Sequence, residues 1–125
     1  MERIREIDRA IAAHGHWKDH LRAAIESGAT EFPIAAIRGD DSCEFGKWLY
    51  GPTISGEEKR SLDYSKITDL HAHFHNVAGR VVELAVGGNR ADAEILQRRD
   101  FDLASEKLIG AMVAWKDKIR AAMLL

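Results

Sequence analysis

The sequence has a single cysteine and only two prolines, and each scarcity narrows what the chain can be. One cysteine cannot form an intrachain disulfide, so nothing argues for an oxidising compartment. No apolar run approaches the roughly 20 residues that a membrane-spanning helix needs. The N-terminal segment is charged and amphipathic, and so it lacks the apolar stretch of a secretory signal. We therefore expect a cytoplasmic protein that does not insert into a membrane.

An excess of charge of either sign is also missing. The chain has 18 Lys and Arg residues against 20 Asp and Glu residues, for a formal net charge of -2. No basic surplus is available to attract nucleic acid or an anionic membrane. The contents of 46% hydrophobic and 30% charged residues are typical of a folded globular protein, and 125 residues suit one domain. We predict a single domain over residues 1–125 with no nucleic-acid partner.

What the sequence does have is helical periodicity. Both prolines, Pro33 and Pro52, lie in the central region, and the stretches on either side are rich in strong helix formers. In the first stretch, a seam of apolar residues that also contains His14 recurs at spacings of three and four from Ile4 to Ile25, interrupted by Lys18. This pattern predicts one helix that ends near Ser27, where the following glycine suits a left-handed cap.

Three further helical regions follow this first one. A short helix is expected from about Asp41 to Tyr50, opened by a capping box of Asp41 and Glu44. A long helix is expected over residues 64–86, stopped by two glycines. Residues 89–99 and 103–123 are predicted as helices with a break near Asp100. Together these elements predict an all-α fold, an antiparallel four-helix-bundle-like domain with a short extra helix that carries the cysteine.

The six histidines divide into two groups by helix face. At about 100° per residue, His14 falls inside the apolar seam of the first helix, and His71 and His75 lie one turn apart on an apolar side. One inward histidine is most often a core residue bonded to a carbonyl. Two histidines at positions i and i+4 can instead present two nitrogens to one metal ion. The other three are predicted to point away from the core: His16, His20 and His73.

Cys43 is the fourth candidate ligand. A lone cysteine is commonly a small buried hydrophobic residue. Here it lies near the expected start of a short helix, where backbone N–H groups and the helix dipole favour a thiolate. A thiolate and three neutral imidazoles form a tetrahedral set well suited to zinc. With all four positions taken by protein, no position is open for an activated water, so we do not expect an enzyme.

Three motifs occur in order along the chain. They are His14-Gly-His-Trp17, Cys43-Glu-Phe-Gly-Lys-Trp48 and His71-Ala-His-Phe-His75. In their residues and spacing they resemble the chemoreceptor zinc-binding (CZB) domain family of bacterial signalling proteins. The resemblance implies an α-helical bundle, often a homodimer, that holds zinc through His14, Cys43, His71 and His75.

The same resemblance implies a regulatory function. In the family the domain is attached to chemotaxis receptors or to diguanylate cyclases, where zinc alters the signalling output. Members have also been linked to oxidant sensing through the zinc-bound cysteine. The expected partner is such a signalling module, in cis or in trans. Four aromatic residues flank the ligands, either as plain core or as a dry shell around the metal: Trp17, Phe45, Trp48 and Phe74.

Other classes of protein also fit parts of the pattern. The same four ligands would serve a purely structural zinc staple. A histidine phosphotransfer module would use an exposed histidine such as His73, although its neighbours supply no cation. A di-iron bundle needs inward carboxylates with Glu-x-x-His spacing, and that spacing does not occur in the sequence.

Overall fold

The computed structural model describes residues 2–124, and every regular element within that range is a helix. In chain order the elements are α1 (Glu2–Gly15), α2 (Trp17–Ser27), α3 (Ile34–Arg38), α4 (Glu44–Tyr50), α5 (Gly56–Lys59), α6 (Leu62–Val86), α7 (Arg90–Leu96), the π-helical turn η1 (Gln97–Phe101) and α8 (Asp102–Met123). None of the helices in residues 2–124 combines the length and the apolar character needed to cross a membrane. The predicted all-α class is confirmed.

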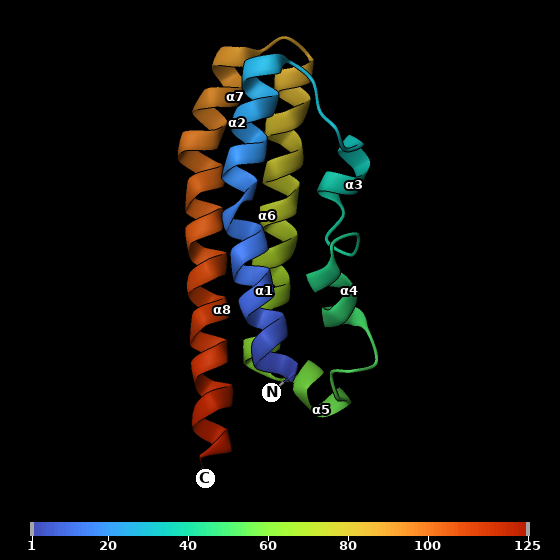
Figure 1. Cartoon of the computed structure of the whole chain (residues 1–125), viewed down its shortest axis with the longest axis vertical. Coiled ribbons are helices and arrows are strands. Elements are labelled where there is room, and N and C mark those ends of the chain that lie inside the picture. The colour runs from blue at the N-terminus through green and yellow to red at the C-terminus, as the bar shows by residue number, and fades with distance from the viewer. Residues whose placement is uncertain (1, 125) are drawn as a thin grey trace.

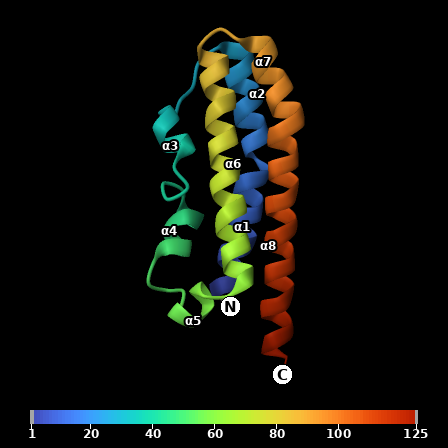
Figure 2. The ribbon, with the colours of Figure 1, turned by 180° about the vertical axis from the view of Figure 1, so that it is seen from behind.

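The chain runs up and down four times to form an antiparallel bundle (Figures 1 and 2). Helices α1 and α2 rise together, the short helices α3, α4 and α5 descend along one side, α6 rises again, and α7, η1 and α8 descend as one rod. Helix α6 is central, since it packs against α2, α3, α7 and α8. Three short helices, α3, α4 and α5, therefore take the place of the second helix of a four-helix bundle. Cys43 directly precedes α4.

The first helix is interrupted where a continuous one was predicted. Helix α1 ends at Gly15 and α2 begins at Trp17, with His16 between them as a turn. Glycine costs about 1 kcal/mol relative to alanine inside a helix, but the interruption is slight, because His16 keeps a helical backbone conformation and its N–H bonds the Ala12 carbonyl at 3.2 Å. The end of α2 agrees with the prediction, because Gly28 is left-handed with φ 70° and its N–H bonds to Ala24.

Helix α4 begins later than predicted, and the expected capping box of Asp41 and Glu44 is wrong. The N-cap is Cys43, whose Sγ accepts a hydrogen bond from the Gly46 N–H at 3.3 Å. A Cβ built on Gly46 would lie 1.7 Å from the carbonyl oxygen of Asp40. The preceding loop therefore passes directly against the first turn of α4. Glycine at position 46 permits this contact, and the contact places Cys43 at the helix start.

Helix α3 was not predicted. It has five residues and a single buried side chain, Ile37, which is too little for a periodic pattern to show in the sequence. Gly79 of α6 lies at this contact, since a Cβ there would lie 2.2 Å from Cγ of the Arg38 side chain.

The break predicted near Asp100 is a π-helical turn within a continuous rod. Helix α7 passes through η1 into α8 without an intervening loop. The wider turn directs Phe101 and Gln97 into the core, and the Gln97 side chain donates a hydrogen bond to the Lys18 carbonyl at 3.3 Å. Phe101 then packs on Phe74 of α6, with ring centroids 5.0 Å apart.

Candidate metal centre

Four side chains from distant parts of the chain converge inside the bundle. His14 comes from the end of α1, Cys43 from the start of α4, and His71 and His75 from the middle of α6. One potential ligand atom from each of the four lies within 4.8 Å of all the others. All three histidines are buried and the cysteine is half-buried. The predicted inward orientation of these histidines is confirmed, and the other three histidines are exposed, as predicted.

Three of the six separations between these ligand atoms are close to those around one tetrahedral zinc ion, and all six are within 4.8 Å. Nε2 of His71 lies 3.1 Å from Nε2 of His14 and 3.1 Å from Nε2 of His75. The same atom lies 3.4 Å from Sγ of Cys43. Zinc–nitrogen bonds of about 2.0–2.1 Å and a zinc–sulfur bond of about 2.3 Å require separations of roughly 3.3 Å and 3.6 Å at tetrahedral angles. The donor set and its spacing therefore both suit zinc.

Two of the imidazoles are oriented by backbone carbonyls. Nδ1 of His14 lies 2.7 Å from the oxygen of Ala10, and Nδ1 of His75 lies 2.9 Å from the oxygen of Ile37. A carbonyl oxygen only accepts, so each Nδ1 carries the hydrogen and each Nε2 keeps a free lone pair. Hydrogen bonds of this type hold metal-binding histidines in the correct tautomer and ring orientation. Both nitrogens that face the shared centre are thus in the form that binds a metal.

His71 is held differently. Its Nδ1 is buried and has no hydrogen-bonding partner among the residues that the structure describes. Leaving such a group unpaired costs about 1–3 kcal/mol. The ring is held by packing, with the ring of Phe45 5.2 Å away and that of His75 4.5 Å away, centroid to centroid. The same orientation of the ring brings Nε2 of His71 within 3.4 Å of the other three ligand atoms. The cost of the unpaired Nδ1 is therefore accepted where the ring is placed to bind a metal.

Burial keeps the three imidazoles neutral near pH 7. It lowers the pKa of His14 to about 4 and that of His71 to about 2, and the neighbouring histidines add to both effects. Burial also lowers the pKa of His75, partly offset by the hydrogen bond to Ile37. Neutral imidazole is the form that binds zinc, so at neutral pH these groups require no deprotonation.

The thiol behaves differently from the sequence-based expectation. Burial raises the pKa of Cys43, and this outweighs the backbone N–H groups of Gly46 and Phe45, which favour the thiolate. The start of a short helix was expected to lower this pKa. Desolvation dominates because the Sγ atom lies against the buried imidazoles. In the metal-free protein the thiol is therefore protonated at neutral pH.

Aromatic rings enclose the centre. Phe74 is fully buried and lies 5.1 Å from the ring of His14 and 5.4 Å from that of His75, centroid to centroid. Phe45 is buried as well, with its ring 5.9 Å from that of His14. Trp17 is half-buried, with its ring 6.4 Å from that of His75. Trp48 packs on Phe45 and so belongs to an outer layer.

Two functional groups were not found from the sequence, the carbonyls of Ala10 and Ile37. The Ala10 carbonyl could have been inferred, because it lies one helical turn before His14. The Ile37 carbonyl comes from a helix that left no periodic signal and lies 38 positions from His75 in the chain.

A buried group of three neutral imidazoles and one thiol, built into an antiparallel helical bundle, defines a metal-binding helical domain. The sequence profile of the chemoreceptor zinc-binding domain family matches residues 14–82, more than half of the chain, and the chain belongs to this family. The matched segment starts at His14 and extends through most of α6, so it contains all four side chains of the centre. Zinc is accordingly the cofactor. Searches of curated proteins and of solved structures found no match.

Proposed function

We propose that this chain is a zinc-binding sensory domain that modulates a bacterial signalling output. Its zinc ligands are His14, Cys43, His71 and His75. The observation that carries the proposal is the convergence of these four ligand atoms within 4.8 Å from α1, α4 and α6. The family match supports the choice of zinc and the sensory role.

Zinc, when bound, supplies a Lewis-acidic cation that four protein atoms can share. Cys43 connects the descending segment of α3, α4 and α5 to the ligands on α1 and α6. His75 adds a second connection, because the Ile37 carbonyl of α3 accepts its Nδ1 hydrogen bond. A ligand at a thousandfold excess over its Kd stabilises the form that binds it by about 4 kcal/mol. Zinc occupancy therefore controls how firmly the descending segment packs on the bundle, and this packing is the signal.

The proposal does not include catalysis. Four protein ligands fill a tetrahedral zinc site, whereas hydrolytic zinc enzymes keep one position for water. The same ligand set would also serve a zinc site that only stabilises the fold, so the sensory role needs a test separate from that of the metal site.

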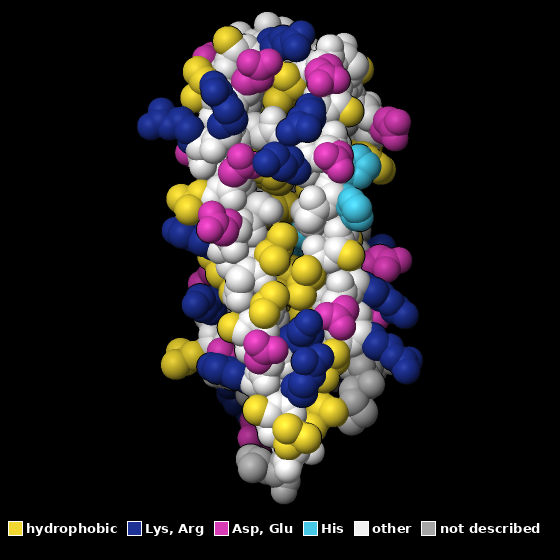
Figure 3. Space-filling view, turned by 60° about the vertical axis from the view of Figure 1, so that its left-hand side comes forward, with side chains coloured by type: hydrophobic (Ala, Val, Ile, Leu, Met, Phe, Trp, Pro, Cys, Tyr) yellow, Lys and Arg dark blue, Asp and Glu magenta, His cyan; other side chains and the backbone are white. Residues whose placement is uncertain are grey.

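The output partner in this proposal is a chemotaxis receptor or a diguanylate cyclase, in cis or in trans. The domain works as a homodimer in the cytoplasm, where a reducing environment keeps its lone thiol available. Two large apolar residues exposed on adjoining faces of α8, Leu103 and Val113, support an interface there. On the face that brings α8 forward, Lys and Arg are interspersed with Asp and Glu, and hydrophobic side chains gather at mid-height (Figure 3). This mixture fits a protein partner and does not suggest nucleic acid.

Oxidants are a second input in this proposal. A hollow of about 190 Å³ is lined by Cys43, His14 and Trp17 and reaches the thiol from the surface. A peroxide that transfers one oxygen atom to the sulfur leaves as an alcohol or water and converts the thiolate to sulfenic acid. The modified sulfur is a poorer ligand. Cys43→Ser should abolish oxidant-triggered zinc release, and unchanged release in that variant would contradict thiol sensing.

The metal site is tested by metal analysis of protein purified without added metal. Wild type should carry about one zinc per chain, weakened or lost in His14→Ala, Cys43→Ala and His71→Ala. His73→Ala is the matched control, because this exposed histidine lies on the same helix as His71 and points away from the centre. Wild-type protein that takes up no zinc even after reconstitution would refute the site.

The sensory role is tested in the cell that carries the protein. Cys43→Ala and His71→Ala should change chemotactic behaviour or the cyclic-di-GMP level when zinc is added or removed, and His73→Ala should not. Loss of zinc with no change in either output would leave the structural staple as the function.

A further inference from the structure

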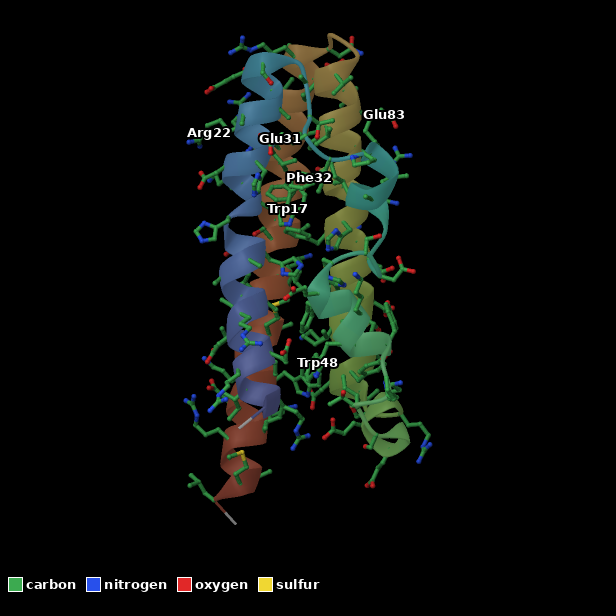
Figure 4. All side chains as sticks on the ribbon, turned by 45° about the vertical axis from the view of Figure 1, so that its right-hand side comes forward. Trp17, Arg22, Glu31, Phe32, Trp48 and Glu83 are labelled. Atoms are coloured by element: carbon green, nitrogen blue, oxygen red, sulfur yellow. The ribbon has the colours of Figure 1, made fainter. Side chains whose placement is uncertain are left out.

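A second hollow lies above the metal centre, between α2, the segment of residues 29–33 and α3 (Figure 4). It has a volume of about 230 Å³. Its inner wall is apolar and comes from α2, α3 and α6: Ala23, Ala24, Ile37 and Val82. Its mouth is formed by aromatic side chains and one acid: Trp17, His20, Phe32 and Glu31.

Three aromatic rings meet at this mouth. The ring of Trp17 lies 5.2 Å from that of His20 and 6.1 Å from that of Phe32, and the last two are 5.9 Å apart, centroid to centroid. The ring planes are inclined to one another by 57°, 52° and 81°, so the rings are not stacked in parallel. The side chains of His20 and Phe32 are exposed, although Phe32 is a large apolar group that a closed core would cover. The rings are therefore accessible to a molecule that enters the hollow.

The electrostatic character of the hollow is negative. Glu31 is the acid in its wall, and the lining residues that the structure describes include no lysine or arginine. Ser27, the last residue of α2, also lines the hollow, and a helix C-terminus carries a partial negative charge. Aromatic faces are also negative and attract cations, most strongly those with weak hydration.

We propose that this hollow binds a small quaternary ammonium cation. The three rings contact the methylated head, Glu31 supplies the opposite charge, and the apolar wall accepts the remainder of the molecule. The volume of the hollow limits the ligand to a small free molecule of the size of choline. This site is separate from the zinc ligands, and no feature of the proposed signalling role requires it.

The hollow is nevertheless connected to the metal centre. Ile37 lines it with its side chain and orients His75 with its carbonyl oxygen. Trp17 lines it and lies 6.4 Å from the ring of His75, centroid to centroid. A bound cation therefore contacts two of the residues that surround the zinc ligand His75.

Isothermal titration of the zinc-loaded protein with choline tests the proposal. The matched probe is 3,3-dimethylbutan-1-ol, in which a neutral tert-butyl group replaces the trimethylammonium head. Choline should bind about tenfold or more tightly than this alcohol, since the difference isolates the charge. Sodium chloride at equal ionic strength controls for screening. Metal content is measured first, so that failure of the zinc site is seen independently of failure here.

Variants at the mouth locate the binding. Phe32→Ala should weaken choline binding about tenfold, and Glu31→Gln should weaken it about threefold. Glu26→Gln removes the same charge from an exposed position on α2 outside the hollow, and should leave binding unchanged. Equal binding of choline and the neutral alcohol, or choline binding that Phe32→Ala does not weaken, would overturn the proposal. Absence of choline binding at millimolar concentration would overturn it as well.

Discussion

Nδ1 of His75 donates a hydrogen bond to the carbonyl oxygen of Ile37, with 2.9 Å between nitrogen and oxygen, and this bond joins α6 to α3. The orientation of one candidate zinc ligand therefore depends on how the short descending segment packs. That segment also carries Cys43. A change in how the descending segment packs on the bundle should therefore also change the affinity for the metal.

Gly79 allows α3 to approach α6 closely enough for this bond. Gly79→Val would place a Cβ 2.2 Å from Cγ and 3.3 Å from Cβ of Arg38, and because its added methyl groups crowd the Arg38 Cβ, we expect α3 to move outward. Displacing the carbonyl that orients a metal-binding histidine typically lowers metal affinity about 10- to 100-fold. Competition with a chromogenic chelator measures the change. Affinity within about twofold of wild type would show that His75 does not need the Ile37 carbonyl.

Gly46 places the thiol. Gly46→Ala would set a Cβ 1.7 Å from the Asp40 carbonyl oxygen, a contact with backbone that cannot be relieved by a side-chain rotation. We expect the variant to lose about 2 kcal/mol or more of unfolding free energy and most of its zinc. Urea denaturation and metal analysis measure the two effects.

Gly110→Ala is the matched control for that experiment. Its Cβ would meet no atom within 4 Å, and the residue lies inside α8. Here alanine should stabilise the protein by about 0.5–1 kcal/mol, because it favours the helix over glycine. If both variants behaved alike, the close approach of Asp40 to α4 would not be needed for folding.

Zinc uptake at pH 7.5 should release about one proton per zinc. The Cys43 thiol is protonated in the metal-free protein because burial raises its pKa, whereas the buried histidines are already neutral. Titration calorimetry in two buffers of different ionisation enthalpy counts the protons. The count in wild type should fall as the pH rises toward the raised pKa of the thiol, because the thiolate then forms before zinc binds. A count near zero in wild type would mean that the thiolate forms before the metal binds.

The metal-free protein should lose stability as the pH falls below about 6.5. The pKa of His14 is about 4 in the folded protein, below its ordinary value of 6.5, so the unfolded chain takes up a proton first. Stability from this group is present above pH 6.5 and is lost as the pH falls toward 4, at about 1.4 kcal/mol per pH unit. His71 acts in the same direction.

Urea midpoints at pH 7.5 and 5.5, measured in the presence of a chelator, test this pH dependence. His71→Phe removes one of the responsible groups and should reduce the slope, whereas the exposed control His73→Ala should keep it. A stability that is flat between the two pH values would mean that the histidines are charged inside the bundle.

The sequence determined the helices and the inward histidines, because both follow from local periodicity. The seam from Ile4 to Ile25 places His14 among apolar residues, and the spacing of His71 and His75 puts both on one face of α6. Each conclusion needs only the 3.6-residue repeat, and burial of all three histidines confirms it. The left-handed glycine after α2 was predictable for the same local reason.

Only the tertiary structure decided where the cysteine lies and how the ligands are oriented. Cys43 is the N-cap of α4, where the Asp40 backbone packs on Gly46, and α3 packs on α6 with Ile37 buried. The raised pKa of the thiol is likewise a result of burial, which outweighs the local effect of the helix start. These features depend on the close turn before α4 and on contacts between distant segments, and neither leaves a periodic pattern in the residues that make it.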